Sequence, residues 1–388
     1  MAQQPVVIVG SGLAGYTVAR EFRKLDTETP LVMLSEDHGG FYSKPMLSNA
    51  FAQKKSADSL LMKDAAKMSA EIKLDVRPNS KVTAIDHRHK QLTVNGEAWP
   101  YHKLVLALGA DPIRLPIQGD GAEAVLSVND LDDYRRFRVA VEGKKNIVIL
   151  GAGLIGCEFA NDLVGAGYKV QVVDLAPQLL GRLLPQEAAA FMQRKLEEEG
   201  VVFHLATTTQ QIEKIQNIEE AGGQFRLTLA NGKTIITDVV LSAVGLRPHT
   251  ALAATAGIQI DRGIVVNSQL QTNFEDIYAL GDCAQVEGRV LPFVMPIMHA
   301  ARALASTLTG KPASVHYPAM PVVVKTPACP TVVAPPEPGM QGEWQVEENA
   351  DGIKAQFHHA NGTLQGFALM GAAISEKAAL TQQLPPLS

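Results

Sequence analysis

The first third of the chain alternates short apolar runs with longer amphipathic stretches. Four consecutive apolar residues, Val6–Val9, predict a buried parallel strand, because such strands are covered on both faces. A helical pattern then runs to about Leu25, and a second apolar run, Leu31–Leu34, ends in a serine and a glutamate. A strand, a helix and a strand within about 30 residues predict a βαβ unit, the building block of an α/β fold.

The turn between the first strand and its helix carries glycines at G-x-G-x-x-G spacing, in the stretch VVIVGSGLAG. The first glycine permits a tight turn, the second lets the backbone approach a pyrophosphate, and the third lets helix and strand pack closely. The helix N-terminus offers unpaired N–H groups to phosphates. An ordinary glycine-rich turn is the alternative, but this context predicts a dinucleotide site. Its expected residues are Gly10, Ser11, Gly12, Leu13, Ala14, Gly15, Ser35 and Glu36.

The pattern returns in the middle of the chain, in the stretch VILGAGLIG. Asn146–Leu150 predicts a strand, a helix follows to about Val164, and the strand Val170–Val173 ends at Asp174. An acidic side chain there can accept hydrogen bonds from a ribose 2′-hydroxyl and would repel a 2′-phosphate, so this second site is expected to prefer NAD over NADP. Its expected residues are Gly151, Gly153, Ile155, Gly156, Asp174 and Gly245.

Two apolar strands that end in glycine and then proline, within Leu104–Pro112 and Val239–Pro248, frame the second unit. We interpret them as the points where the chain leaves one domain and returns to it. A further strand is expected in DIYALGDCA, and an alanine-rich helix after Pro296. Six prolines between Pro318 and Pro336 exclude a long helix there, and a small mixed α/β domain is expected to follow. The predicted domains are 1–112 and 241–312 (first nucleotide domain), 113–240 (inserted second nucleotide domain) and 313–388.

Composition narrows the function. A chain of 388 residues with 46% hydrophobic and 19% charged residues predicts two or three globular domains. Its net charge of −5 argues against nucleic-acid binding, which needs a basic excess. No apolar run reaches the roughly 18 residues of a membrane span, and the N-terminus lacks the basic segment of a signal peptide. Three widely separated cysteines are typical of the reduced cytoplasm.

Five stretches carry a family resemblance: YSKPMLS (42–48), GLIGCEFANDL (153–163), SAVGLRP, YALGDCA and VKTPACP (324–330). Together with the paired glycine motifs, they resemble the pyridine nucleotide-disulfide oxidoreductase family, and within it the bacterial rubredoxin–NAD⁺ reductases. The resemblance implies an α/β fold of two Rossmann-like domains, with the NAD domain inserted in the FAD domain, and a small C-terminal α+β domain. FAD would stay bound in the first domain, while NADH would visit the second and transfer a hydride to flavin N5.

The resemblance also implies roles for residues that composition and spacing leave ambiguous. Asp282, after Gly281, would bind the FAD ribitol, although a turn aspartate is the plain alternative. Lys44 and Glu158 would form an ion pair beside flavin N5; otherwise they are a solvated lysine and a helix-dipole glutamate. Further implied FAD contacts are Val82, Gly109, Val294 and Lys325.

The cysteines indicate how electrons leave. The disulfide reductases of this family carry a C-x-x-C or C-x-x-x-x-C pair, and this chain has neither. Where peroxide-type members carry a single cysteine, this chain has Ser43, and its own cysteines are expected to be buried and inert. Adjacent His358 and His359 would face opposite sides of a strand, so no metal site is expected.

Reduced flavin must therefore pass its electrons to an external acceptor. The resemblance implies rubredoxin, bound transiently, with the electrons serving a hydroxylase such as alkane hydroxylase. We expect local lysines (Lys44, Lys54, Lys55 and Lys325) to attract this acceptor, and the enzyme to be a monomer or homodimer. Ferredoxin or flavorubredoxin reductase activity, an NADH oxidase that uses oxygen, and a redox-sensing NADH/FAD-binding protein are the alternatives.

Overall fold

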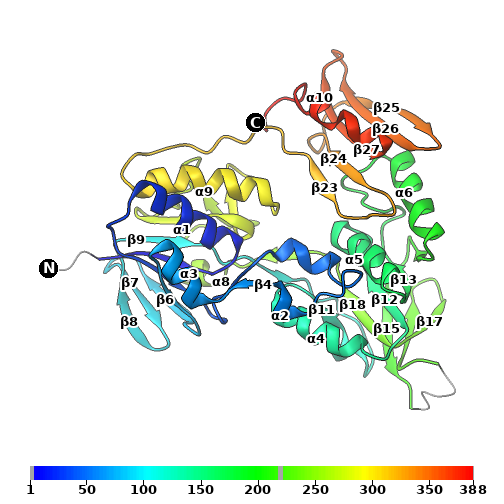
Figure 1. Cartoon of the computed structure of the whole chain (residues 1–388), viewed down its shortest axis with the longest axis horizontal. Helices are drawn as coiled ribbons and strands as arrows, with labels where there is room; N and C mark the ends of the chain where they lie inside the picture. Colours follow the sequence, from blue (N-terminus) through cyan, green and yellow to red (C-terminus); the bar gives the residue numbers. More distant parts are fainter. Residues whose placement is uncertain (1–3, 217–221, 388) are drawn as a thin grey trace. The chain divides into compact units, whose positions relative to one another are not determined.

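The computed structural model describes residues 4–216 and 222–387, and the chain divides into two compact units (Figure 1). The first unit comprises Met1–Lys44, Asp58–Asp111 and Leu246–Tyr317. The second comprises Pro45–Ala57, Pro112–Gly245 and Pro318–Ser388. The four-segment division predicted from the sequence is finer than this one and stays a prediction.

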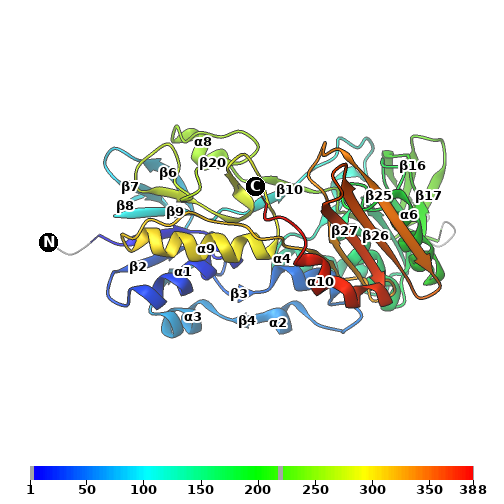
Figure 2. The same ribbon diagram turned by 90° about the horizontal axis from the view of Figure 1, so that it is seen from above.

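A five-stranded parallel sheet forms the centre of the first unit. Its order is β21 (Ile277–Ala279), β9 (Lys103–Leu106), β1 (Val6–Val9), β2 (Leu31–Leu34) and β5 (Asp75–Arg77). Every residue of β1 and β2 is buried, which explains why both sequences are uninterrupted apolar runs. Helices α1 (Leu13–Leu25) and α9 (Val294–Leu308) pack side by side (Figures 1 and 2). The predicted strands Val6–Val9 and Leu31–Leu34, and the helix that ends at Leu25, are confirmed.

The first unit also contains smaller sheets. The strands β6 (Val82–Asp86), β7 (Gln91–Val94) and β8 (Glu97–Pro100) form an antiparallel sheet, and β10 (Ala110–Pro112) pairs with β19 (Leu246–Pro248). Helix α9 begins at Val294, two residues before Pro296, whereas the predicted start lay after Pro296. Proline fits inside a first helical turn, because its missing N–H would have no intrahelical acceptor there. The prediction therefore placed this helix start too late.

The second unit contains a second parallel sheet. Its order is β11 (Leu126–Ser127), β18 (Val239–Ser242), β12 (Asn146–Leu150), β13 (Lys169–Val173) and β14 (Val202–His204). Helix α5 (Leu154–Gly165) follows β12, and α4 (Leu131–Val141) and α6 (Gln186–Glu198) belong to the same part. A three-stranded antiparallel sheet of β15 (Thr209–Lys214), β16 (Phe225–Leu229) and β17 (Thr234–Thr237) lies in this unit as well. The predicted strands at Asn146–Leu150 and Val170–Val173 are confirmed, as is the helix between them.

The C-terminal part of the second unit is an antiparallel sheet with a short helix (Figure 2). Its strand order is β23 (Val322–Val324), β24 (Thr331–Ala334), β27 (Leu364–Gly371), β26 (Gly352–His359) and β25 (Gly342–Asn349). After β27 come the 3₁₀ turn η4 (Ala372–Glu376) and helix α10 (Lys377–Thr381). A small C-terminal α+β domain was expected and is confirmed. The loop between β23 and β24 carries the sequence KTPACP, which brings Lys325 to the end of a strand.

Candidate functional site

The first glycine loop joins β1 to α1, and its three glycines have different surroundings. Gly10 has a φ of +113°, and a Cβ there would lie 2.2 Å from the carbonyl oxygen of Ala107. A Cβ at Gly15 would lie 2.0 Å from the carbonyl oxygen of Gly10. Gly12 has an ordinary φ of −69°, and a Cβ there would meet no atom of the described residues within 4 Å. The protein's own packing therefore requires glycine at positions 10 and 15, whereas Gly12 faces open space at a helix N-terminus, where a pyrophosphate fits.

The end of β2 contributes a hydrogen-bonded group beside this loop. The hydroxyls of Ser11 and Ser35 lie 2.6 Å apart, and Ser35 donates to Oδ1 of Asp37 over 2.5 Å. The backbone N–H of Gly39 donates to the same Asp37 oxygen over 2.8 Å. Sequence reasoning missed Asp37, although an acid three residues beyond the end of β2 was a usable signal. Glu36 forms an exposed ion pair of 2.5 Å with Lys81, so its carboxylate stays at the surface.

Asp282 lies in the first unit, in the turn after β21. Burial raises the pKa of Asp282, and the positive charge of Lys44 partly opposes this shift. Partial burial weakens the hydration of a carboxyl group and favours hydrogen-bonding hydroxyl partners. The preceding residue, Gly281, has a φ of +80° and Gly109 has a φ of +72°, both in the region that favours glycine. Val82 opens β6, and Val294 opens α9.

The second glycine loop, between β12 and α5, repeats the arrangement of the first. A Cβ at Gly156 would lie 1.9 Å from the carbonyl oxygen of Gly151, and one at Gly151 would lie 2.7 Å from that of Ala243. A Cβ at Gly153 would meet no described atom within 4 Å. This loop therefore has the same open middle position as the first one, and Ile155, 41% exposed, follows it.

Asp174, at the end of β13, holds this loop in place. Its carboxylate accepts hydrogen bonds from the backbone N–H of Ala152, inside the loop, and over 2.7 Å from that of Ala176. Each carboxylate oxygen keeps a further lone pair, so a ribose hydroxyl can still bind. Leu175 beside it is 74% exposed, and Gly245, with a φ of +115°, ends the segment after β18.

Helix α5 buries two carboxylates on one face, those of Glu158 and Asp162. Residues four apart stack on the same side of a helix, and two like charges there destabilise it unless both are neutralised. The Glu158 side chain is fully buried, and its oxygens bind Lys325 twice: Oε1 accepts the backbone N–H over 2.9 Å, and Oε2 accepts the ammonium. Lys325 is a partner of Glu158 that sequence reasoning missed, and the expected pair of Glu158 with Lys44 stays a prediction.

Asp162 and Asn161 fix two neighbouring segments to the same helix. Asp162 accepts the backbone N–H groups of Phe51 over 2.7 Å and Ala52 over 3.0 Å. Burial raises the pKa of Asp162, and these backbone hydrogen bonds oppose that shift. Asn161 accepts the N–H of Ala328 over 3.0 Å. The helix that follows the second glycine loop therefore holds both the 45–57 segment and the loop that carries Lys325.

The three cysteines are free and buried. Burial raises the pKa of Cys283 to about 12, and the pKa values of Cys157 and Cys329 also lie above the ordinary value. A protonated, buried thiol is a poor nucleophile. Neighbouring His358 and His359 lie at the end of β26, and among the described residues no three metal-ligating side chains gather. Within the same residues, no helix is long and apolar enough to cross a membrane.

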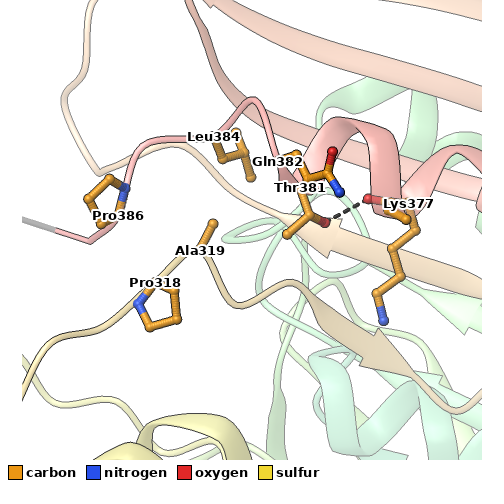
Figure 3. A pocket seen from close by; sticks show the side chains of 8 residues that line it. Pro318, Ala319, Lys377, Thr381, Gln382, Leu384 and Pro386 are labelled. Carbon is orange, nitrogen blue, oxygen red and sulfur yellow. Dashed lines mark hydrogen bonds between the residues drawn. The ribbon is translucent and has the colours of Figure 1, made fainter.

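A pocket of about 520 Å³ opens in the C-terminal part of the second unit (Figure 3). Its lining comes from the residues just before β23 and from α10 and the segment after it, where Thr381 donates to the carbonyl oxygen of Lys377 over 2.6 Å. The lining residues are Pro318, Ala319, Lys377, Ala378, Thr381, Gln382, Leu384 and Pro386. None of them was predicted to bind a cofactor.

Comparison with known proteins supplies the wider context. A family model described as pyridine nucleotide-disulphide oxidoreductase matches residues 4–307, and one described as rubredoxin binding C-terminal domain matches residues 314–384. A rubredoxin-NAD(+) reductase of Acinetobacter baylyi is 50% identical, over 99% of this chain and 98% of that protein. One of Alcanivorax borkumensis is 48% identical, over 99% of both chains.

A solved structure shows the same arrangement of elements. The ferredoxin reductase for the CYP199A2 system from Rhodopseudomonas palustris matches with a TM-score of 0.86 at 26% identity. The match covers 98% of this chain and 95% of that one. The fold is therefore shared with a protein that is much more distant in sequence than the two reductases.

Proposed function

Because the chain belongs to the pyridine nucleotide-disulphide oxidoreductase family, we propose that it is an FAD-dependent NADH:rubredoxin reductase. The observation that carries the proposal is the pair of rubredoxin-NAD(+) reductases that match it at 50% and 48% identity over nearly their whole lengths. The match of residues 314–384 to a rubredoxin-binding domain supports the same acceptor.

The first glycine loop fits FAD. The open space at Gly12 and the N–H groups of the α1 N-terminus suit the pyrophosphate, and the Ser11–Ser35 pair with Glu36 suits the adenosine ribose. We assign Asp282 to the ribitol hydroxyls and the N-terminus of α9, at Val294, to the flavin ring, where its dipole favours negative charge. Backbone contacts are assigned to Val82 and Gly109. FAD, when bound, can accept two electrons together and release them one at a time.

The second glycine loop fits NADH. Gly153 leaves room for the pyrophosphate, and Ile155 and Gly156 lie in the first turn of helix α5, whose N-terminus faces it. We assign the free lone pairs of Asp174 to the ribose hydroxyls of NADH, where a 2′-phosphate would be repelled. Gly245 is assigned to the same nucleotide. The chain therefore prefers NADH over NADPH.

Lys44, Glu158 and Lys325 are assigned to the redox-active end of FAD. Lys325 donates its backbone N–H to one Glu158 oxygen and its ammonium to the other, and an ammonium placed in this way stabilises negative charge that develops on an acceptor. Because the Lys325 charge is neutralised by Glu158, Lys54 and Lys55 are the better candidates for attracting an acidic partner.

No thiol takes part in this scheme. The three cysteines are buried and protonated at neutral pH, so electrons pass directly to the iron centre of the docked acceptor. The encounter is expected to be weak and small in area, because the carrier leaves after each electron. We place the protein in the cytoplasm, where unpaired cysteines stay reduced. We further propose that its electrons serve a hydroxylase such as alkane hydroxylase.

The test is steady-state oxidation of NADH by the FAD-loaded protein, with rubredoxin, ferredoxin or oxygen as the sole acceptor. We expect rubredoxin to give the highest kcat/KM, and oxygen consumption without a carrier to be slow. Fast oxygen consumption that rubredoxin does not change would identify an NADH oxidase instead. Negligible turnover with every acceptor, despite binding of NADH, would favour the redox-sensing alternative.

A further inference from the structure

Ser48 connects the two charged side chains of the α5 cluster, and no step described above uses it. Its hydroxyl donates to Oε2 of Glu158 over 2.5 Å and accepts from the ammonium of Lys325 over 2.8 Å. The Ser48 residue is 3% exposed. It is the last residue of the YSKPMLS stretch, whose lysine alone was assigned a role from the sequence.

Every hydrogen of the Lys325 ammonium and of the Ser48 hydroxyl has an acceptor in this cluster. The Lys325 ammonium has three hydrogens, and it has three acceptors: the carbonyl oxygen of Pro45 at 2.6 Å, the Ser48 hydroxyl, and Oε2 of Glu158. The Ser48 hydroxyl has a single hydrogen. The Pro45 carbonyl, at 3.4 Å, is a much weaker acceptor for it than the carboxylate. A fully satisfied polar network of this kind is rigid.

The position of Ser48 is itself set by α5. It lies in the 3₁₀ turn Lys44–Asn49, and the residues just beyond that turn, Phe51 and Ala52, bind Asp162 through their backbone N–H groups. One turn of α5 thus carries Glu158, while the next fixes the segment that brings the Ser48 hydroxyl to it. The position of the Ser48 hydroxyl is therefore fixed in two ways: its backbone segment is bound to α5, and the hydroxyl itself is bound to the Glu158 carboxylate.

We propose that Ser48 is a positioning residue for reduction of the flavin by NADH: its hydroxyl fixes the Lys325 ammonium on the Glu158 carboxylate in one orientation. The proposal rests on the proposed function, in which Lys325, whose side chain is 26% exposed, contacts FAD and the buried Glu158 holds it in place. A lysine side chain has four rotatable bonds and loses much freedom when it is fixed. Without the hydroxyl, the ammonium keeps an unpaired hydrogen and the carboxylate loses a donor, so several orientations become comparable in energy.

The plain alternative is that Ser48 only fills space in a buried turn. Threonine and valine separate the two possibilities, because they have nearly the same shape and differ by the hydroxyl. Ser48→Thr and Ser48→Val both add a methyl group at the same place. Any difference between these two variants therefore reports the hydrogen bonds, whereas an effect that they share reports packing.

The first measurement needs no catalytic activity. Purified FAD-loaded protein is treated with an amine-acylating reagent, and the modification rate of Lys325 is read by mass spectrometry, with exposed Lys24 as internal reference. We expect Lys325 to be modified about tenfold faster in Ser48→Val than in the wild type, and within about twofold of the wild type in Ser48→Thr. Equal rates in the two variants would overturn the proposal.

The second measurement is the rate of flavin bleaching by NADH in a stopped-flow instrument. We expect Ser48→Val to lower the limiting rate constant by about tenfold, the scale of one hydrogen bond to a charged group, with an unchanged apparent Kd for NADH. Ser48→Thr should restore the rate to within about twofold of the wild type. Faster acylation of Lys325 in Ser48→Val with wild-type bleaching would show a structural role only and overturn the proposal. If NADH does not bleach the wild-type flavin at all, the proposed function itself fails, and this inference with it.

Discussion

The backbone N–H of Lys325 donates a hydrogen bond of 2.9 Å to Oε1 of Glu158, 167 residues earlier in the chain, and its ammonium binds the other oxygen of the same carboxylate. The main chain and the side chain of one residue thus neutralise a single, fully buried charge. The contact joins the end of strand β23 to helix α5, which follows the second glycine loop. It makes Glu158 and Lys325 an interdependent pair.

Removal of Lys325 and removal of Glu158 should lower the free energy of unfolding by different amounts. Lys325→Met strands a fully buried carboxylate and should destabilise the protein by about 3 kcal/mol or more. Glu158→Gln leaves an ammonium whose side chain is 26% exposed and can be hydrated, so the loss should be clearly smaller. Thermal unfolding of the two variants measures the difference. A larger loss in Glu158→Gln would show that the lysine, not the carboxylate, is the group that needs its partner.

The middle glycine of the first loop should matter for FAD and not for folding. Gly12→Ala places a methyl group in space that the protein leaves open, so we expect a folded protein that retains FAD at least about tenfold less tightly. Gly15→Ala, whose Cβ would lie 2.0 Å from a backbone oxygen, should fold poorly. Flavin content after gel filtration and circular dichroism measure the two effects. Full retention of FAD by Gly12→Ala would show that the pyrophosphate does not bind at this loop.

Asp174 should determine the choice between NADH and NADPH. Asp174→Asn removes the charge that repels a 2′-phosphate and weakens the bonds to the ribose, worth about 1.5–3 kcal/mol, so the KM for NADH should rise about tenfold or more and discrimination against NADPH should narrow. Asp238→Asn is the control, because Asp238 also accepts two backbone N–H groups, those of Lys145 and Asn146. An equal change of KM in both variants would mean that Asp174 acts through loop stability alone.

The buried thiol of Cys283 should make the protein sensitive to alkali. Its pKa is raised by burial from 9.0 to about 12, so the unfolded chain releases this proton first as the pH increases. The stabilisation from the protonated thiol is therefore complete below about pH 9 and is lost as the pH rises toward 12. Between pH 8 and 11, the unfolding temperature should fall less steeply with pH in Cys283→Ala than in the wild type. The reason is that unfolding of the variant releases about one proton fewer. Parallel curves for variant and wild type would contradict the raised pKa.

Local sequence predicts the parts of this structure that depend on local physics. The strands Val6–Val9 and Asn146–Leu150 are apolar because they are buried on both faces, and the glycines after them are fixed by contacts within one βα unit. The cluster around Glu158 depends on residues 110 and 167 positions away. No periodicity links such residues, so the sequence indicated that Glu158 and Lys325 matter but not that they pair, and it gave no reason to select Ser48. The hydrogen bond from the backbone N–H of Ala152 to Asp174 could likewise not be predicted from periodicity.

We propose that electrons pass from NADH through FAD to rubredoxin without a protein thiol. The most direct test is NADH-dependent reduction of rubredoxin by a variant in which Cys157, Cys283 and Cys329 are all replaced by alanine, compared with the wild type. Because all three thiols are buried and free, the folded, FAD-loaded variant should reduce rubredoxin at a rate within about threefold of the wild type, with any loss confined to stability. A variant whose flavin is reduced normally by NADH, but which no longer reduces rubredoxin, would reveal a thiol relay and contradict this account.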